Sequence, residues 1–314
     1  MEGSRNPASP TRSIDSRVHL FLLAVQLSFA GFHVAGKLIF RQLTPLTLAG
    51  LRVACATPLL LWFAWHHDRV LPRWRDLPIL ALLGLLGVCL NQTLFVLGLQ
   101  RTTATSASIL MPSIPVFAVA IGAISGIERI GWRRLLGIVL AVVGAIMMLD
   151  PTRFSLSESH TIGNLLVLTN CLSYAGFLVL QRPVVRRLPW RTVIAWSFLF
   201  GSLGILTVSW HDLTSLNPAT LRPETWWLLV YVVLIPTVFA YATNTWAVHR
   251  STPTLVAVYI TFQPLATAAL ARAVLGEPLG LRQILGFLLI GAGLVRVSTA
   301  ISHETGGEPS ELID

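Results

Sequence analysis

The sequence contains one pattern twice, and this duplication limits the possible folds more than any other feature. A motif in the first half, Ser28-Phe29-Ala30-Gly31-Phe32-x-Val34-x-x-Lys37, returns as Ser173-Tyr174-Ala175-Gly176-Phe177-x-Val179-x-x-Arg182. Further residues recur at one constant shift, so that Pro115 returns as Pro264 and Gly137 as Gly286. Because the residues of this second set return in register without a gap, the chain is predicted to consist of two copies of one structural unit.

The composition indicates a membrane protein. Hydrophobic residues make up 54% of the 314 residues, charged residues only 12%, and the mean hydropathy is +0.70. These values are too apolar for an ordinary soluble domain. The net charge of +9 comes from short basic clusters between apolar runs, which favours a role in membrane topology over nucleic-acid binding. The three cysteines lie within apolar runs and lack metal-ligand spacing, so no metal site is expected.

Ten apolar segments are long enough to cross a bilayer, whose hydrocarbon core of about 30 Å needs about 20 helical residues. The predicted segments are 18–40, 44–65, 77–98, 104–125 and 131–149 in the first copy, and 163–182, 192–210, 225–247, 253–275 and 281–299 in the second. Since each copy crosses an odd number of times, the second is expected to enter the membrane inverted relative to the first. Inverted repeats around a midplane substrate site are typical of secondary transporters.

The predicted fold is therefore an all-α membrane protein with ten transmembrane helices as two inverted five-helix repeats. The repeats cover 18–149 and 163–299, and a loop at 150–162 connects them. A disordered tail at 1–17 and an acidic, disordered tail at 300–314 flank the repeats. Arginines are concentrated in the loops on the side of the amino terminus, so both termini are expected in the cytoplasm. The arginine-rich composition, with a single lysine, favours a bacterial plasma membrane as the location.

Polar side chains inside the predicted spans are candidates for a substrate site, because unpaired polar groups are costly there. The candidates are His33, Lys37, Asn91, Gln92, Tyr174, Tyr241, Asn244, Tyr259 and Gln263. The alternatives are that Lys37 reaches the outer interface, that His33 only packs, and that the amides join helices. No Asp or Glu falls within the ten segments, so proton coupling would need His33, and downhill transport or exchange would not. Arg52 is expected to reach outward or to pair with a helix end.

Proline interrupts two equivalent predicted helices. Pro112 and Pro115 lie in the fourth segment and Pro264 in the ninth, and each ring removes a helical hydrogen bond and frees a carbonyl. Interrupted helices at matching positions indicate a transport site and its gating. A packing kink would leave the same pattern. Glu128 and Glu277 follow these helices, each with an arginine five residues later, which predicts interfacial ion pairs rather than gates.

The ordered set of motifs resembles the EamA-type branch of the drug/metabolite transporter superfamily over residues 18–299. The resemblance rests on Leu51-Arg52, on Asn91-Gln92 followed by Leu99-Gln100-Arg101-Thr102-Thr103-Ala104, on the proline of the fourth segment, on Glu128 and on the helix from Gly137 to Gly144. Several of these residues recur in the second copy. The resemblance implies two inverted five-helix repeats around a central cavity, with alternating access for small metabolites.

Together these observations predict a secondary transporter that exports small organic metabolites, such as amino-acid-like or amphipathic solutes. The chain lacks a P-loop motif, so it is not expected to hydrolyse ATP. The expected partners are a small-molecule substrate and the lipid bilayer, in a monomer or homodimer, without nucleic acid or cofactor. The competing functions are a membrane-embedded enzyme or receptor, which lacks a catalytic constellation here, and a passive channel, whose flux would not saturate.

Overall fold

The fold was analysed in a computed structural model, which describes residues 16–102, 107–108, 110–128, 131–147, 158–275 and 281–305. Within these ranges the chain is helical and contains no strand. The helices of the first half are α1 (Ser16–Ile39), α2 (Pro45–His67), α3 (Leu77–Gly84), α4 (Asn91–Arg101), α6 (Ser113–Ile124) and α7 (Trp132–Met147). Those of the second half are α8 (Glu158–Val185), α9 (Trp190–Thr214), α10 (Pro223–Val233), α11 (Ala240–Arg250), α12 (Pro253–Tyr259), α13 (Gln263–Leu275) and α14 (Leu281–Thr305).

Six helical stretches in the described part are long and apolar enough to cross a membrane. They are Ser16–Ile39, Pro45–His67, Trp74–Arg101, Thr161–Val185, Trp190–Thr214 and Pro223–Arg250. The predicted fourth span is helical in α6 over only 12 residues, and residues 103–106 and 109 lie outside the described ranges. Some helices begin earlier or end later than the sequence predicted, as α14 does at Thr305. Hydropathy locates only the apolar part of a helix, whereas the backbone ladder continues into polar residues.

The duplication is visible in an unusual local feature. The predicted third span contains a π-helical segment, Leu85–Leu90, between α3 and α4, and the predicted eighth span contains one at Leu234–Phe239, between α10 and α11. The two segments occupy equivalent positions, because the sequence repeat aligns residue 85 with residue 234. Such wide turns leave backbone groups without their usual partners and are frequent at functional sites.

Close glycine contacts join the last helices of the two halves. A Cβ atom added at Gly137 of α7 would lie 2.9 Å from the carbonyl oxygen of Gly293 in α14, and one added at Gly144 would lie 2.7 Å from that of Gly286. Position 137 is thus opposite 293 and position 144 opposite 286, so the two helices are antiparallel. Small residues let membrane helices approach closely enough for extensive van der Waals contact.

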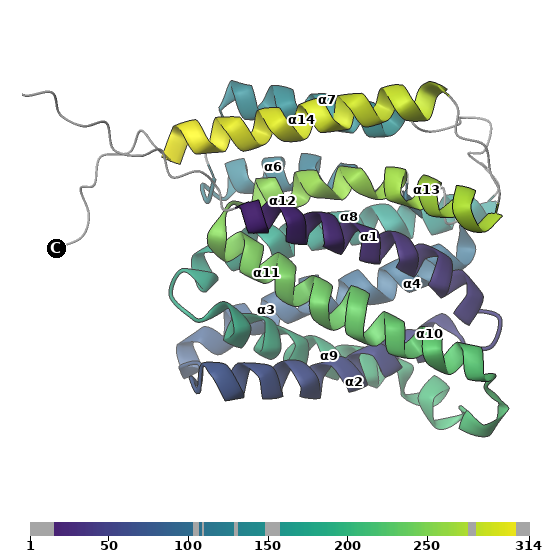
Figure 1. The fold of residues 1–314 in the computed structure, drawn as a ribbon. Coiled ribbons are helices and arrows are strands. Elements are labelled where there is room, and N and C mark those ends of the chain that lie inside the picture. Colours follow the sequence, from purple (N-terminus) through teal and green to yellow (C-terminus); the bar gives the residue numbers. More distant parts are fainter. Residues whose placement is uncertain are drawn as a thin grey trace, which may run out of the picture.

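The second helices of the two halves are also antiparallel. Gly50, near the start of α2, packs against Ser209 near the end of α9, while Asp68 after α2 pairs with Arg191 at the start of α9 at 2.8 Å. Figure 1 shows α2 and α9 along one edge of the bundle and α7 and α14 along the opposite edge.

The remaining contacts follow the same exchange of halves. Helix α4 packs on α8 and α1 packs on α11, while α6 packs on α8 and α1 on α13. Each of these four contacts therefore has a counterpart with the halves exchanged. Helix α1 begins and α14 ends at the same end of the bundle (Figure 1).

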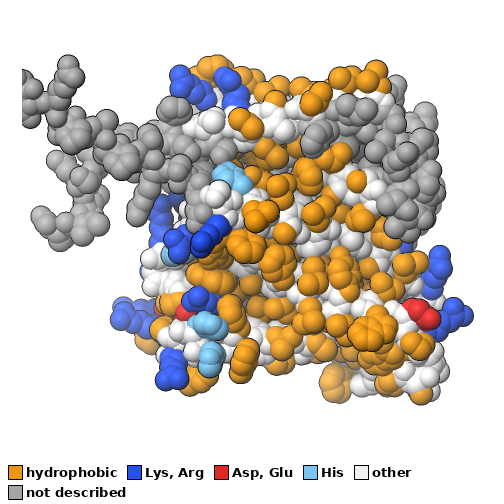
Figure 2. All heavy atoms as spheres, in the orientation of Figure 1, with side chains coloured by type: hydrophobic (Ala, Val, Ile, Leu, Met, Phe, Trp, Pro, Cys, Tyr) orange, Lys and Arg blue, Asp and Glu red, His pale blue; other side chains and the backbone are white. Residues whose placement is uncertain are grey.

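The surface is apolar around the middle of the bundle and basic towards the helix ends (Figure 2). Large apolar side chains are exposed on the outside of the bundle. Leu20, for example, is 67% exposed, and Leu203 is 58% exposed. Exposed tryptophans lie near helix ends, namely Trp62, Trp65, Trp74, Trp132, Trp210, Trp226 and Trp227. An apolar belt with tryptophan near its borders is the surface expected of a protein that spans a membrane.

The glycine crossing gives a test of the packing. A Cβ atom at Gly293 would lie 2.5 Å from the Gly137 carbonyl oxygen, whereas one at Gly291 of the same helix meets nothing within 4 Å. We expect Gly293→Ala to destabilise the protein by about 1–3 kcal/mol, because the helices must separate. Gly291→Ala should leave stability unchanged or raise it slightly. Thermal unfolding in detergent measures both, and equal effects of the two variants would contradict the crossing.

Candidate functional site

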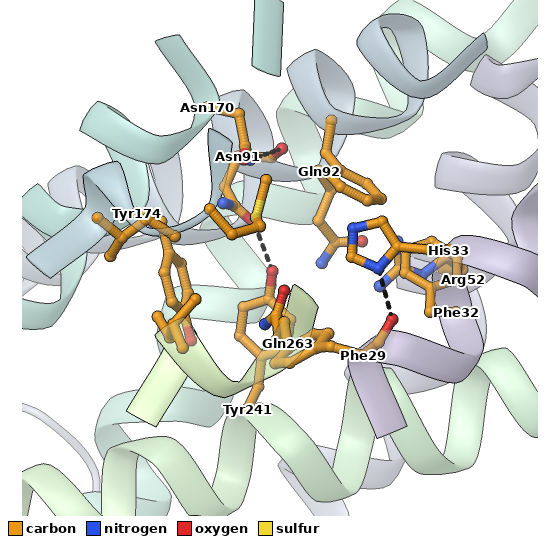
Figure 3. A pocket seen from close by; sticks show the side chains of 14 residues that line it. Phe29, Phe32, His33, Arg52, Asn91, Gln92, Asn170, Tyr174, Tyr241 and Gln263 are labelled. Carbon is orange, nitrogen blue, oxygen red and sulfur yellow. Dashed lines mark hydrogen bonds between the residues drawn. The ribbon is translucent and has the colours of Figure 1, made fainter. Parts of the chain in front are cut away.

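A cavity lies in the middle of the bundle, where the two halves meet (Figure 3). The space inside it is about 50 Å³, which is below the range of about 300–1,000 Å³ for small-molecule sites, and the volume reaches about 460 Å³ only when space open to solvent is included. Helices α1, α2, α4, α6, α8 and α11 and the α12–α13 junction all contribute to its wall. The lining residues are Phe29, Phe32, His33, Arg52, Asn91, Gln92, Phe95, Met111, Ile114, Asn170, Tyr174, Tyr241, Ile260 and Gln263.

Hydrogen bonds across the cavity wall connect the two halves. Tyr241 on α11 donates its hydroxyl to Asn91 Oδ1 on α4 at 2.5 Å, and Asn170 Nδ2 on α8 donates to the Asn91 main-chain carbonyl at 2.7 Å. Behind the wall, Asn244 Nδ2 donates to the Tyr174 hydroxyl at 2.6 Å. These bonds fix the tyrosine rings and amides in place.

Other polar atoms of the wall have no partner. His33 faces the Phe29 carbonyl with Nδ1 at 2.8 Å, so the neutral ring carries its proton on Nδ1 and leaves Nε2 as an acceptor without a partner. Neither amide atom of Gln92 is hydrogen-bonded, and Gln263 uses Nε2 to reach Gln26 but leaves Oε1 unpaired. Buried polar groups are normally paired, so unpaired atoms beside a cavity are candidates to bind a ligand.

Arg52 is the main correction to the sequence analysis. We expected it to reach outward or to pair with a helix end, but its side chain is 2% exposed and lines the cavity. Its side chain points inward because the face of α2 that carries Arg52 lies against α1 and against the π-helical segment between α10 and α11. In Figure 3, Arg52, His33 and Gln92 lie on one side of the cavity and Tyr174 on the opposite side. Hydropathy alone could not give this direction, although an arginine in an otherwise uncharged span was the available signal.

The structure brings six of the nine candidate residues together: His33, Asn91, Gln92, Tyr174, Tyr241 and Gln263 line the cavity. The other three do not. Lys37 Nζ donates to the Thr102 carbonyl at 2.6 Å at the end of α4, Asn244 lies behind Tyr174, and the Tyr259 hydroxyl bonds His19 Nδ1 at 2.5 Å. Sequence reasoning did not single out the apolar wall, although Phe29 and Phe32 belong to the repeated motif.

The prolines lie at helix interruptions next to the cavity. Pro112 precedes α6, Pro115 lies in its first turn, and Pro264 follows the 3₁₀ turn that separates α12 from α13. The carbonyls four residues before Pro115 and Pro264 are not free, contrary to our expectation, because main-chain groups bind them. The Ile114 N–H donates to the Met111 carbonyl at 2.9 Å, and the Gln263 N–H donates to the Ile260 carbonyl. The turns thus position neighbouring side chains, such as Gln263, rather than offer backbone ligands.

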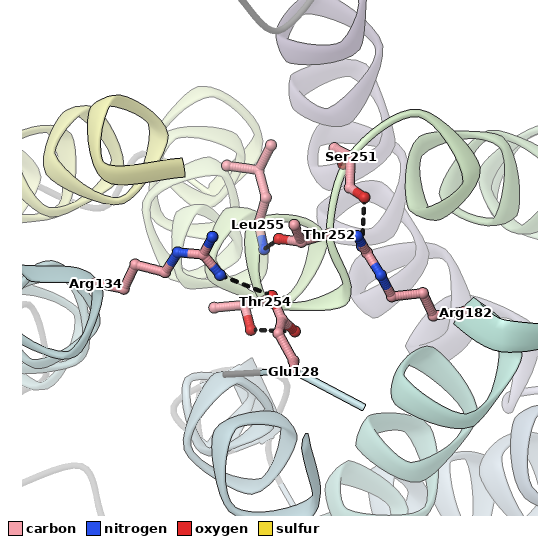
Figure 4. A network of polar contacts seen from close by, with 7 residues as sticks. All are labelled: Glu128, Arg134, Arg182, Ser251, Thr252, Thr254 and Leu255. Atoms are coloured by element: carbon pink, nitrogen blue, oxygen red, sulfur yellow. Dashed lines mark hydrogen bonds and ion pairs between the residues drawn. The ribbon is translucent and has the colours of Figure 1, made fainter. Parts of the chain in front are cut away.

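A polar network closes one end of the interface between the halves (Figure 4). Glu128, which follows α6, accepts from Arg134 Nη1 at 3.2 Å and from Thr254 Oγ1 of α12 at 2.7 Å. The two residues of the ion pair are therefore six positions apart in sequence, not the five that were predicted. The bond from Thr254 links Glu128 to the other half. Glu277, the predicted counterpart, lies outside the described residues.

Two cations cap equivalent helix ends. Lys37 donates to the Thr102 carbonyl after α4, and Arg182 Nη1 donates to the Ser251 carbonyl after α11. The donors Lys37 and Arg182 occupy equivalent positions of the repeated motif, and the acceptors Thr102 and Ser251 are equivalent at the constant shift. Cations at helix carboxyl ends stabilise the exposed carbonyls there.

A duplicated bundle with an apolar belt and a polar cavity between its halves defines a multi-pass membrane protein of the transporter class. The sequence profile of the EamA-like transporter family matches residues 16–150 and again 161–299. The chain belongs to this family.

Similar proteins agree with this assignment. An uncharacterized transporter of Archaeoglobus fulgidus is 30% identical, over 93% of this chain and all of that protein. The Arabidopsis thaliana protein WALLS ARE THIN 1 is 28% identical, over 92% of this chain and 84% of that protein. A solved crystal structure matches 92% of this chain and 99% of its own, with a TM-score of 0.72 at 15% identity, which supports the fold alone.

Removing the Glu128 carboxylate should destabilise the protein strongly. Glu128 and Arg134 are 5% and 6% exposed, and breaking a buried pair costs about 3–5 kcal/mol. The control is Arg187→Ala, which breaks a pair with Asp76. The arginine is 55% exposed, and the Asp76 carboxylate, although only 9% exposed, still accepts from the Arg73 N–H, so this variant should cost less than Glu128→Ala. Unfolding midpoints of Glu128→Ala and Arg187→Ala measure the difference, and a Glu128→Ala midpoint equal to that of the control would contradict this role.

Proposed function

We propose that this protein is a secondary transporter that exports small organic solutes across the plasma membrane by alternating access. In this proposal ten helical segments cross the bilayer as two inverted five-helix repeats, with both termini in the cytoplasm. The observation that carries the proposal is the cavity between the halves, which combines aromatic rings with unpaired polar atoms. Such a lining suits a solute of mixed polarity.

Two features support movement of the halves about the cavity. Contacts between helices recur with the halves exchanged, so a conformation opened at one end has a structural counterpart opened at the other. The helices nearest the cavity are interrupted at equivalent places, at Pro112 and at the 3₁₀ turn before Pro264. Broken helices at matching positions of inverted repeats are typical of transport sites.

The competing functions are a membrane-embedded enzyme or receptor and a passive channel. Uptake of labelled candidate solutes into inside-out vesicles, with and without the protein, distinguishes them. Saturable, protein-dependent flux with counterflow supports a transporter, and flux proportional to concentration supports a channel. An absence of protein-dependent flux across a broad panel of solutes would overturn the proposal.

Gln92 allows transport to be separated from stability. Its amide is buried and unpaired, so Gln92→Met should stabilise the fold by about 1–3 kcal/mol while reducing flux. Gln181 on α8 is the matched control, since its amide is also buried and unpaired but does not line the cavity. Gln181→Met should stabilise the fold and leave flux unchanged. Equal flux in both variants would remove Gln92 from the site.

The orientation is tested by labelling introduced cysteines with a membrane-impermeant maleimide in intact cells. Arg73 and Arg222 are exposed and lie in loops at opposite ends of the bundle. In a variant without the three native cysteines, Arg222→Cys should react from outside and Arg73→Cys only after permeabilisation. The reverse pattern, or the same pattern for both, would refute cytoplasmic termini or the crossing number.

A further inference from the structure

Arg52 brings a positive charge to the middle of the bundle, and the protein holds it rigidly. Its Nε donates to Thr237 Oγ1 at 3.0 Å, and the Thr237 hydroxyl donates in turn to the Val232 carbonyl at 2.6 Å. That carbonyl is five residues before Thr237, and Thr237 itself lies in the π-helical segment of the eighth span. The wide turn therefore supplies the hydroxyl that orients the arginine.

The face of the guanidinium is also occupied. Its Cζ lies 4.2 Å from the centroid of the Phe32 ring, which is a cation–π arrangement. Among the described residues, neither Nη atom has a hydrogen-bond or ion-pair partner, and no Asp or Glu lines the cavity. The protein thus fixes Nε and one face and leaves the two Nη groups of the fork available.

A buried charge of this kind is expensive unless it is paired. Arginine cannot escape the cost by losing its proton, because its pKa is too high in proteins. The missing partner is then supplied by what fills the cavity, either water or a bound solute. A planar carboxylate matches the fork best, because its two oxygens accept two parallel N–H bonds.

We propose that Arg52 binds the carboxylate of the transported solute, so that the substrates are small organic monoanions with an apolar or aromatic body. This inference rests on the transport function proposed above. The single arginine balances one negative charge, and Phe29, Phe95, Met111 and Ile260 surround the rest of the space. A solute ammonium group would find amide, imidazole and tyrosine acceptors and aromatic rings, but no opposite charge, since no carboxylate lines the cavity.

The test uses four ligands that share a phenyl ring and a three-carbon chain. They are 3-phenylpropanoate, its neutral amide, the corresponding amine 3-phenylpropylamine, and phenylalanine, which adds an ammonium group to the first. Binding to the purified protein is measured by isothermal titration. The wild type should bind 3-phenylpropanoate about 10- to 100-fold more tightly than the amide, and bind phenylalanine no more tightly than 3-phenylpropanoate. Equal binding of acid and amide, preference for the amine, or no binding of the acid overturns the proposal.

Variants then assign the preference to Arg52. Arg52→Gln should reduce affinity for the acid to that for the amide, and Arg52→Lys should keep part of the preference as a single charge. The control is Arg41→Gln, an exposed arginine outside the cavity, which should retain the full preference. A folded Arg52→Gln protein that still prefers the acid refutes the assignment. If that variant does not fold, Thr237→Val, which removes the hydroxyl that accepts from Nε and donates to the Val232 carbonyl, must weaken acid binding relative to amide binding or the assignment fails.

Flux in proteoliposomes separates this inference from the transport function. Selective binding of the acid without saturable flux would refute transport and leave the anion site standing. Saturable flux of neutral or cationic solutes, with the acid excluded, would support transport and refute the anion site.

Discussion

The hydrophobic effect does not hold the helices of this bundle together, and this constraint determines how they pack. Lipid is as apolar as the helix surfaces, so association depends on close backbone packing and on polar groups that find partners inside. The antiparallel crossing of α7 and α14 at Gly137 and Gly293 provides the first, and the bonds of Asn91 with Tyr241 and Asn170 provide the second. The same constraint makes each unpaired polar atom in the interior significant.

Several of the unpaired buried atoms line the space that the protein leaves. Around the cavity, Gln92, His33 and Gln263 keep atoms without partners, and Arg52 keeps its Nη groups free among the described residues. Beside the interrupted helices, by contrast, the hydroxyl groups of Ser113 and Thr261 are satisfied by nearby carbonyls. The π-helical turn at Leu234–Phe239 connects the two situations, because it both disturbs the helix and orients Arg52 through Thr237.

Much of this architecture could be predicted from the sequence, because hydropathy and repetition are written along the chain. The duplication predicted equivalent helices, and the proline positions predicted the interruptions of the α6 and α12–α13 helices. The direction of a side chain around its helix was harder. Lys37 and Arg52 both lie in apolar spans, yet Lys37 caps a helix end while Arg52 faces the cavity.

The difference depends on which neighbouring helix each residue meets, and that is tertiary information. The π-helical segments were not predicted either. Leu85–Leu90 is apolar throughout and carries no local signal for a wider turn, whereas Leu234–Phe239 contains Pro236, a helix-disturbing residue that was the available signal. Tyr259 was expected near Gln263 from helical spacing, but the 3₁₀ turn between them rotates it away from the cavity.

The site is less symmetric than the scaffold that surrounds it. At the shift of the repeated motif, in which Ser28 returns as Ser173, Arg52 corresponds to Ser197, so the charge exists in one half only. Two mirrored states of a symmetric lining would hold a solute equally well from either side of the membrane. If the protein alternates access as proposed, an arginine carried by one half alone makes the inward- and outward-facing states differ in how they solvate that charge, and the affinity for a solute then depends on the side from which it arrives.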